Sequence, residues 1–176
     1  MRGLNISWTR RALATPAKAR RGLTLRIERL RRYFPEMKPN MTVGITRAFD
    51  GLAFQALDGS AKLMVDMHRS RADSWKFPTY WTLAHELMHL AQFNSKGIPG
   101  GERACDIHAL SRLPPRFIDD SPSYLVVPPR IRKTWNKKYA SLAHSLAIQA
   151  LRKRKNGVRN YAVWWENEFE RRVGGE

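Results

Sequence analysis

The sequence predicts an α+β fold in which a small antiparallel sheet packs on a series of helices. Two patterns lead to this prediction. Between Met41 and Met67, apolar and polar residues alternate in short runs, which is typical of strands with one buried face. From Thr79 onwards, apolar residues instead recur at helical spacing, in segments separated by glycine and proline. At 176 residues, the chain is long enough to bury a hydrophobic core as a single domain.

The N-terminal residues are expected to form a basic arm followed by a helix. Residues 1–22 are rich in arginine, alanine and threonine and contain Pro16, so we predict a flexible arm with at most a short helical turn. Apolar residues then recur at roughly helical spacing from Thr24 to Phe34. This pattern predicts a first amphipathic helix that ends before Pro35.

Three short strands are predicted next, separated by Asp-Gly turns. Residues 41–45 alternate in polarity, and a second apolar run at residues 52–57 follows Asp50-Gly51, so these two segments are expected to form a hairpin. Asp58-Gly59 then turns the chain into a third alternating segment at residues 63–67. Together they predict a small antiparallel sheet.

Four helices are predicted in the remainder of the chain. The first runs from Thr79 to Phe93 and is followed by glycine and proline, and the second spans residues 102–113 and ends at two prolines. Residues 114–130 are rich in proline and are expected to be mostly irregular. The last two helices are expected at residues 135–151 and 158–173, each with an apolar stripe.

The net charge of +17 is unevenly distributed. Residues 1–40 carry a net charge of +9, residues 41–129 are neutral, and residues 130–176 carry +8. We therefore predict three parts within one domain: a basic arm at residues 1–22, a core at residues 23–129, and basic C-terminal helices that pack on the core. The basic ends could be solvated helix faces, or they could bind nucleic acid or an anionic membrane surface.

Cysteine content and hydropathy limit the class of protein. Cys105 is the only cysteine, which excludes an internal disulfide and a four-cysteine zinc site, and we expect it to be a small buried hydrophobe. Residues 4–14 lack the apolar run of a secretory signal. No apolar stretch approaches the ~20 residues that a membrane-spanning helix needs. These features predict a cytoplasmic protein without a transmembrane segment.

The segment His85-Glu86-Leu87-Met88-His89 has the spacing of a metal site. Residues four apart share a helix face, so His85 and His89 can direct imidazole nitrogens at one ion. A bound Zn²⁺ would lower the pKa of a water molecule toward ~7, and Glu86 is predicted to take its proton and later to protonate the leaving amine. The alternative is a surface helix, but the apolar neighbours imply burial, where unpaired histidine and glutamate would be costly.

A catalytic zinc ion needs a third protein ligand, and three residues after the motif are candidates. Glu102 and Asp106 are four apart and share a face of the next predicted helix, whereas His108 points away from that face. Either carboxylate could bind the ion while the other supports it. The alternative is structural, with Glu102 stabilised at a helix N-terminus and Asp106 paired with an arginine.

The two motifs resemble those of the gluzincin metallopeptidases, in which a His-Glu-x-x-His helix precedes a helix bearing Glu-x-x-x-Asp. Here the second motif is Glu102-Arg103-Ala104-Cys105-Asp106, and the similarity, over roughly residues 63–110, is greatest to compact single-domain (minigluzincin-like) members. The resemblance implies a zincin-like fold and Zn²⁺ bound by His85, His89 and Glu102, with Asp106 orienting a ligating histidine. It also implies that residues 63–68 form an antiparallel edge strand to which substrate backbone adds.

The chain departs from the gluzincin pattern in two places. Only twelve residues separate His89 from Glu102, so their connection must turn sharply, which its glycines and prolines allow. No residue matches the tyrosine or histidine that stabilises the oxyanion in larger members. The candidate donors are His108, Arg112, Tyr124 and His144.

The sequence therefore predicts a zinc-dependent metallopeptidase acting on a peptide or protein, with basic ends that could recruit it to nucleic acid. The alternative is a nucleic-acid-binding protein whose zinc site is structural or vestigial. In the last helix, Trp164 and Trp165 could stack on single-stranded nucleic acid beside Lys153, Arg154 and Arg159, although aromatics at helical spacing more often pack a core. Substrate specificity and oligomeric state do not follow from the sequence.

Overall fold

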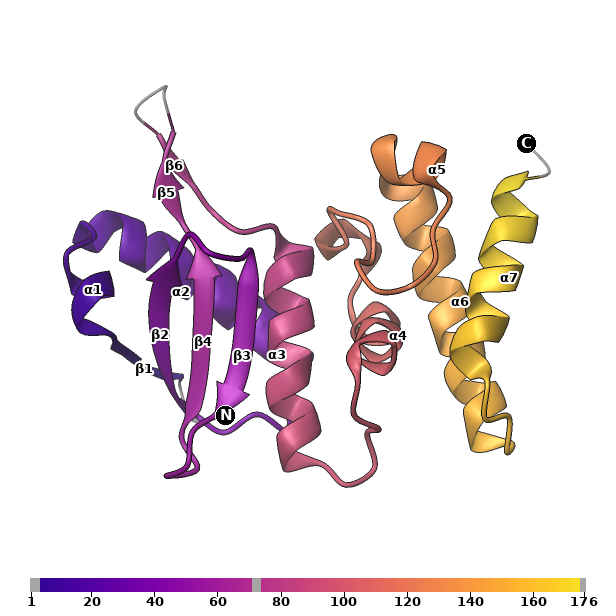
Figure 1. The fold of residues 1–176 in the computed structure, drawn as a ribbon, viewed down its shortest axis with the longest axis horizontal. Helices are drawn as coiled ribbons and strands as arrows, with labels where there is room; N and C mark the ends of the chain where they lie inside the picture. Colours follow the sequence, from indigo (N-terminus) through magenta and orange to yellow (C-terminus); the bar gives the residue numbers. More distant parts are fainter. Residues whose placement is uncertain (1–3, 71–73, 175–176) are drawn as a thin grey trace. The chain divides into compact units, whose positions relative to one another are not determined.

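The structure is a computed structural model that describes residues 4–70 and 74–174. It contains two compact units, Met1–Lys96 and Gly97–Glu176. The first unit combines a sheet with helices, and the regular elements described in the second are helical (Figure 1). This division falls between the two motif helices.

The elements of the first unit are β1 (Asn5–Trp8), α1 (Arg10–Leu13), α2 (Ala17–Arg31), β2 (Asn40–Thr46), β3 (Gly51–Gln55), β4 (Ala61–Asp66), β5 (His68–Arg69), β6 (Trp75–Lys76) and α3 (Tyr80–Asn94). Those of the second are α4 (Glu102–Arg112), η1 (Pro115–Phe117), α5 (Pro129–Lys133), α6 (Lys137–Lys155) and α7 (Tyr161–Gly174). Every helix within the described residues is too short or too polar to traverse a lipid bilayer.

The sheet of the first unit is mixed, with the strand order β1-β2-β4-β3. Strands β1, β2 and β4 are parallel, and β3 runs antiparallel to β4. The α+β class is confirmed, but the predicted all-antiparallel sheet is wrong. The predicted hairpin between residues 41–45 and 52–57 is also wrong, because β3 pairs with β4 across the Asp58-Gly59 turn. Alternating polarity identifies the buried face of a strand but neither its partner nor its direction.

Strand β4 lies inside the sheet. Leu63 pairs with Val43 of β2 on one side and with Ala53 of β3 on the other. The prediction that residues 63–68 form an edge strand is therefore wrong, since both edges of β4 are already hydrogen-bonded. The antiparallel edge strand is β3, which contacts α3. The chain leaves the sheet after Asp66, and β5 pairs with β6 in a separate two-stranded sheet.

The N-terminal segment is built into the first unit. Among the described residues of the predicted arm, β1 adds a parallel strand to β2, and α1 and the start of α2 follow it. The amide of Asn5 donates to Pro39 (2.8 Å) and that of Thr9 to Val43 (3.0 Å). Ala12 and Ala19 are buried. The flexible arm predicted for residues 1–22 is thus not found at residues 5–22, and residues 1–3 lie outside the described residues.

Arginines of α2 anchor the start of the motif helix. The guanidinium of Arg26 lies over the rings of Phe77 and Tyr80, 5.0 and 4.8 Å from their centroids. Arg29 donates to the Tyr80 hydroxyl (3.0 Å). Phe77 fits against α2 because Gly22 has no Cβ, which would lie 2.8 Å from the Phe77 ring. Part of the positive charge in the N-terminal segment therefore has a structural role.

The predicted helices of the motifs are confirmed to within one or two residues. Helix α3 begins after Thr79, whose side chain caps it by accepting the amide of Thr82 (3.0 Å). Helix α4 begins at Glu102 as predicted. The two C-terminal helices are also present as α6 and α7, although α6 begins at Lys137, two residues after the predicted start, and residues 175–176 lie outside the described residues.

Helix α7 packs into the second unit through its aromatic residues. Trp165 is fully buried, stacks on Phe169 with ring centroids 4.9 Å apart, and donates to the carbonyl oxygen of Ala143 (3.1 Å). The core interpretation of Trp165 is therefore confirmed, and its ring is not available for stacking on a nucleobase. Trp164 is half-buried, with the Lys153 ammonium 4.8 Å from its ring centroid.

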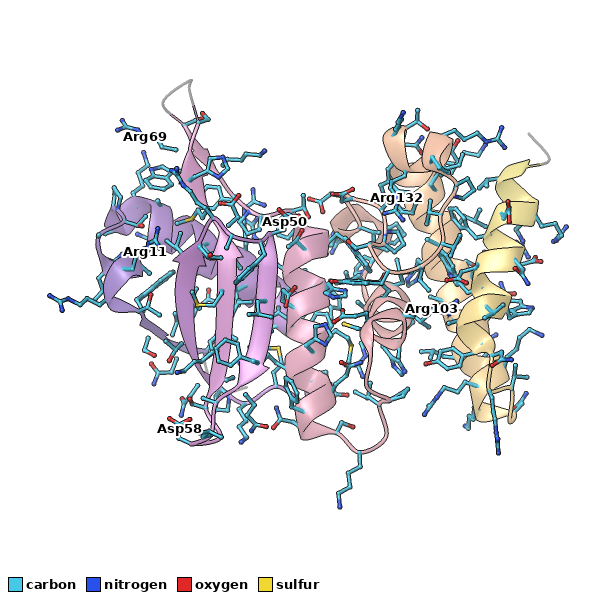
Figure 2. The ribbon with its side chains drawn as sticks, in the orientation of Figure 1. Arg11, Asp50, Asp58, Arg69, Arg103 and Arg132 are labelled. Carbon is cyan, nitrogen blue, oxygen red and sulfur yellow. The ribbon has the colours of Figure 1, made fainter. Side chains whose placement is uncertain are left out.

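The irregular segment before α5 is held by three charged side chains from α4, α5 and α7. These are Asp106, Arg132 and Glu166, and Figure 2 shows Arg132 beside the segment. Asp106 accepts hydrogen bonds from the amides of Tyr124 and Leu125, at 2.8 and 3.2 Å. Glu166 accepts one from the amide of Val126 at 3.0 Å and also pairs with Arg103. Arg132 donates to the carbonyl oxygens of Pro122 and Leu125, at 2.7 and 3.2 Å. The proline-rich segment is thus fixed although it has little regular structure.

Candidate metal and catalytic site

The two histidines of the motif lie one turn apart on α3, and their imidazoles meet. The Nε2 atoms of His85 and His89 are 3.1 Å apart, and the two rings are nearly perpendicular, at 83°. Two imidazoles that bind one tetrahedral zinc ion, each with a Zn–N bond of about 2.0–2.1 Å, hold their nitrogens about 3.3 Å apart. The pair therefore fits a shared metal ion, which could be held between the two Nε2 atoms.

The orientation of His89 is fixed from its other ring nitrogen. Its Nδ1–H donates to Oε1 of Gln92 at 2.9 Å. A neutral imidazole that keeps its proton on Nδ1 presents an unprotonated Nε2, which is the form that binds a metal. Gln92 thus selects the tautomer of His89 that a metal site requires. Sequence reasoning missed this residue, although its position three residues after His89 on a helix was a signal for the contact.

Gln92→Leu is expected to weaken zinc binding by about 10- to 100-fold, because the variant loses the acceptor that orients His89. Competition with a chromogenic chelator would measure the zinc affinity. Gln92→Glu is the matched control, since it keeps an acceptor of the same length and should retain wild-type affinity or exceed it. Equal zinc affinity in the leucine variant and the wild type would contradict this role of Gln92.

Glu86 lies against the first residue of the edge strand. A Cβ added at Gly51 would come within 2.8 Å of the Glu86 Cγ and 2.9 Å of its Oε1, so the backbone of β3 passes unusually close to this carboxylate. The carbonyl oxygen of Asp50, labelled in Figure 2, accepts the amide of Asp66 at 3.0 Å and fixes this end of β3 beside β4. Glycine at position 51 therefore leaves the space that the buried Glu86 side chain occupies.

Gly51→Ala is expected to reduce peptide hydrolysis by about 10- to 100-fold, because the new methyl group must displace the Glu86 carboxylate or the strand, and a shift of ~1 Å is costly in an active site. Zinc content should not change, since the three atoms nearest to the added Cβ all belong to Glu86 rather than to a histidine. Steady-state kinetics and metal analysis would measure both. Leu57→Ala, at an exposed residue beyond the end of β3, is the control. Loss of zinc together with activity would contradict a role confined to Glu86.

The remaining predicted site residues belong to α4 and the rest of the second unit. Glu102 is the exposed first residue of α4, and Asp106 is fully buried on the same helix. One oxygen of Asp106, Oδ2, accepts both loop amides, a contact that the sequence did not reveal. Within the first unit, the imidazoles of His85 and His89 meet, and the Glu86 side chain lies against Gly51, while its role as a base stays a prediction. Ligation by Glu102 and orientation of a histidine by Asp106 stay predictions.

The four candidate oxyanion donors all lie among the described residues, and two of them are on α4, where His108 is buried and Arg112 is half-buried. His144 contacts the carbonyl oxygen of Leu110 through Nδ1 (2.8 Å), which ties α6 to α4. Tyr124 is exposed at the segment that Asp106 holds. Cys105 is buried in α4, as predicted.

Comparison with known proteins gives no relative for this chain. No family model matches it, and no match was found among curated proteins or solved structures. The assignment of function therefore depends on the residues and their geometry.

Proposed function

We propose that this chain is a zinc-dependent metallopeptidase whose metal ion is bound by His85 and His89. The observation that carries the proposal is the 3.1 Å separation of the two Nε2 atoms, in an arrangement that one tetrahedral ion can bridge. His85 is buried and His89 half-buried on an apolar helix, so a metal ion at this pair would be shielded from bulk water. The resemblance of the two helical motifs to those of gluzincins supports the same function.

Glu86 is the proposed general base. A bound Zn²⁺ would activate a water molecule and polarise the carbonyl group of the substrate. The Glu86 carboxylate then receives the proton of that water and delivers it to the amine that leaves. Glu86 is buried and lies against Gly51, so its carboxylate is held in one place beside the start of β3.

Glu102 is the proposed third ligand, and Asp106 the proposed positioning residue for a ligating histidine. The glutamate of the second motif provides the oxygen ligand that completes a two-histidine, one-carboxylate set with an open position for water and substrate. Cys105 of the same helix is the alternative ligand, since a thiolate also binds zinc strongly.

The edge strand proposed for substrate binding is β3. It stands at the end of the sheet beside α3, and its first residue lies against Glu86. A peptide that adds to β3 as a further strand would bring its backbone past the proposed base. This assignment replaces residues 63–68, whose strand is hydrogen-bonded on both sides.

Removal and restoration of metal test the proposal. Chelator-treated protein is expected to lose hydrolysis of a quenched fluorescent peptide library, and one equivalent of Zn²⁺ is expected to restore it. The matched control is the His85→Ala/His89→Ala variant, which should not respond to zinc. A wild-type protein that binds zinc and cleaves no peptide would contradict the proposal and favour a nucleic-acid-binding protein with a structural zinc ion.

A further inference from the structure

The first unit has a basic pocket at the carboxyl ends of the parallel strands β2 and β4. Its volume is about 300 Å³. Arg11 enters it from α1, Arg47 from the end of β2, and Arg69 and Trp75 from the paired strands β5 and β6. Figure 2 labels Arg11 and Arg69 in this part of the unit. Ligands of open sheets commonly bind outside the carboxyl ends of parallel strands, so the location suits a binding site.

The charge of the pocket is positive. Three arginines are among its described lining residues, and none of these residues is acidic. Asp66, at the end of β4, is directed at His68, whose Nδ1 lies 3.0 Å from the Asp66 Oδ1. Arg11 and Arg47 are exposed to solvent. Several guanidinium groups around one cavity are typical of a phosphate site, because each can donate two parallel hydrogen bonds to phosphate oxygens.

The pocket also offers an aromatic surface. Trp75 is half-buried and lines the pocket beside the arginines. Other arginines of this unit already lie over aromatic rings, for example Arg20 over Trp8 at 5.7 Å and Arg26 over Phe77 at 5.0 Å. A basic surface combined with an indole ring is the arrangement that single-stranded nucleic acid requires, since phosphates bind the cations and bases stack on the ring.

We propose that this pocket binds a phosphate group of single-stranded nucleic acid, with a neighbouring base stacked on Trp75. The volume suits one phosphate with part of its nucleoside rather than a duplex, which is recognised in its major groove by an inserted helix or ribbon. An acidic peptide would satisfy the arginines but has no planar group for the indole. The pocket would be the place where nucleic acid binds this chain, a role predicted from the sequence for the basic termini. The proposal does not depend on peptidase activity.

Fluorescence anisotropy with a short labelled oligothymidylate tests the proposal. Arg11→Ala/Arg47→Ala is expected to weaken binding about tenfold or more and to lower the salt dependence, as a log–log slope, by about 1.4. The matched control is Lys18→Ala/Arg21→Ala, which removes two exposed charges from α2 of the same unit and should change binding less than about twofold. Trp75→Ala should weaken binding about fivefold or more, and Trp75→Phe should restore it.

Three outcomes would overturn the proposal. Equal losses in the pocket variant and the α2 control would mean that binding reflects only the net charge. Displacement of the oligonucleotide by poly-glutamate at the same concentration would assign the pocket to carboxylates. Thymidine monophosphate binding as tightly as the oligonucleotide would identify a free nucleotide as the ligand. Far-UV circular dichroism and thermal melting ensure that each variant compared is folded.

Discussion

Glu86→Gln is expected to lower kcat/KM for peptide hydrolysis by about 10²- to 10⁴-fold while leaving bound zinc unchanged. Glutamine has the shape of glutamate but cannot take up the proton of the attacking water. Glu86 follows His85 directly and packs against Gly51, so the amide should occupy the same space without disturbing the two imidazoles. The effect should therefore fall on kcat rather than on metal content.

Kinetics with a cleaved peptide, together with metal analysis of the same samples, would measure this effect. Glu170→Gln is the control, because Glu170 is exposed on α7 and should behave as wild type. If Glu86→Gln retained full activity, another group would have to act as the base and the proposed mechanism would be wrong. If it lost zinc as well as activity, Glu86 would be acting as a ligand.

Glu102→Ala is expected to weaken zinc binding by about 100-fold or more and to abolish hydrolysis. Without Glu102, the proposed site keeps only the two histidines of its three protein ligands. Residues that only orient a ligand already contribute about 10- to 100-fold to metal affinity, so the loss of a ligand itself should cost at least as much. Glu102 is the exposed first residue of α4, so its removal should cost little folding stability. The loss of affinity would then report on metal binding itself.

Competition with a chromogenic chelator would measure the zinc affinity, and Cys105→Ser is the matched comparison on the same helix. The proposed ligand set predicts wild-type zinc binding in Cys105→Ser. The reverse result, with affinity lost in the cysteine variant and kept in Glu102→Ala, would assign the third ligand to the thiolate.

Local features of the fold could be predicted from the sequence. Helix α3 was predictable because Thr79 provides a cap and apolar residues follow at helical spacing. The approach of His85 to His89 was predictable for the same reason, since residues four apart on a helix always share a face. Such features depend only on neighbours along the chain.

Pairing between distant strands could not be predicted in this way. The alternation of residues 41–45 correctly indicated a strand, but it did not show that Val43 pairs with Leu63 or that the pair is parallel. The wrong edge strand came instead from the resemblance to gluzincins, which places such a strand directly before the motif helix. β1 was missed because it is short and half-exposed, so its apolar pattern is weak.

The supporting residues of the site were harder to predict than the motif. Gly51 reads in the sequence as part of a turn, and only the packing of β3 on α3 shows that it makes room for Glu86. Likewise, the carboxylate of Asp106 binds the amides of Tyr124 and Leu125, which lie far along the chain. Contacts of this kind depend on the three-dimensional structure and leave little trace in residue spacing.

X-ray absorption spectroscopy of the zinc-loaded protein is the most direct test of the central claim. The proposed site predicts one zinc ion per chain with only nitrogen and oxygen neighbours at about 2.0–2.2 Å, including two imidazoles that disappear in the His85→Ala/His89→Ala variant. This coordination leaves a position for water and substrate. A sulfur neighbour at about 2.3 Å, or a zinc ion that survives removal of both histidines, would contradict it.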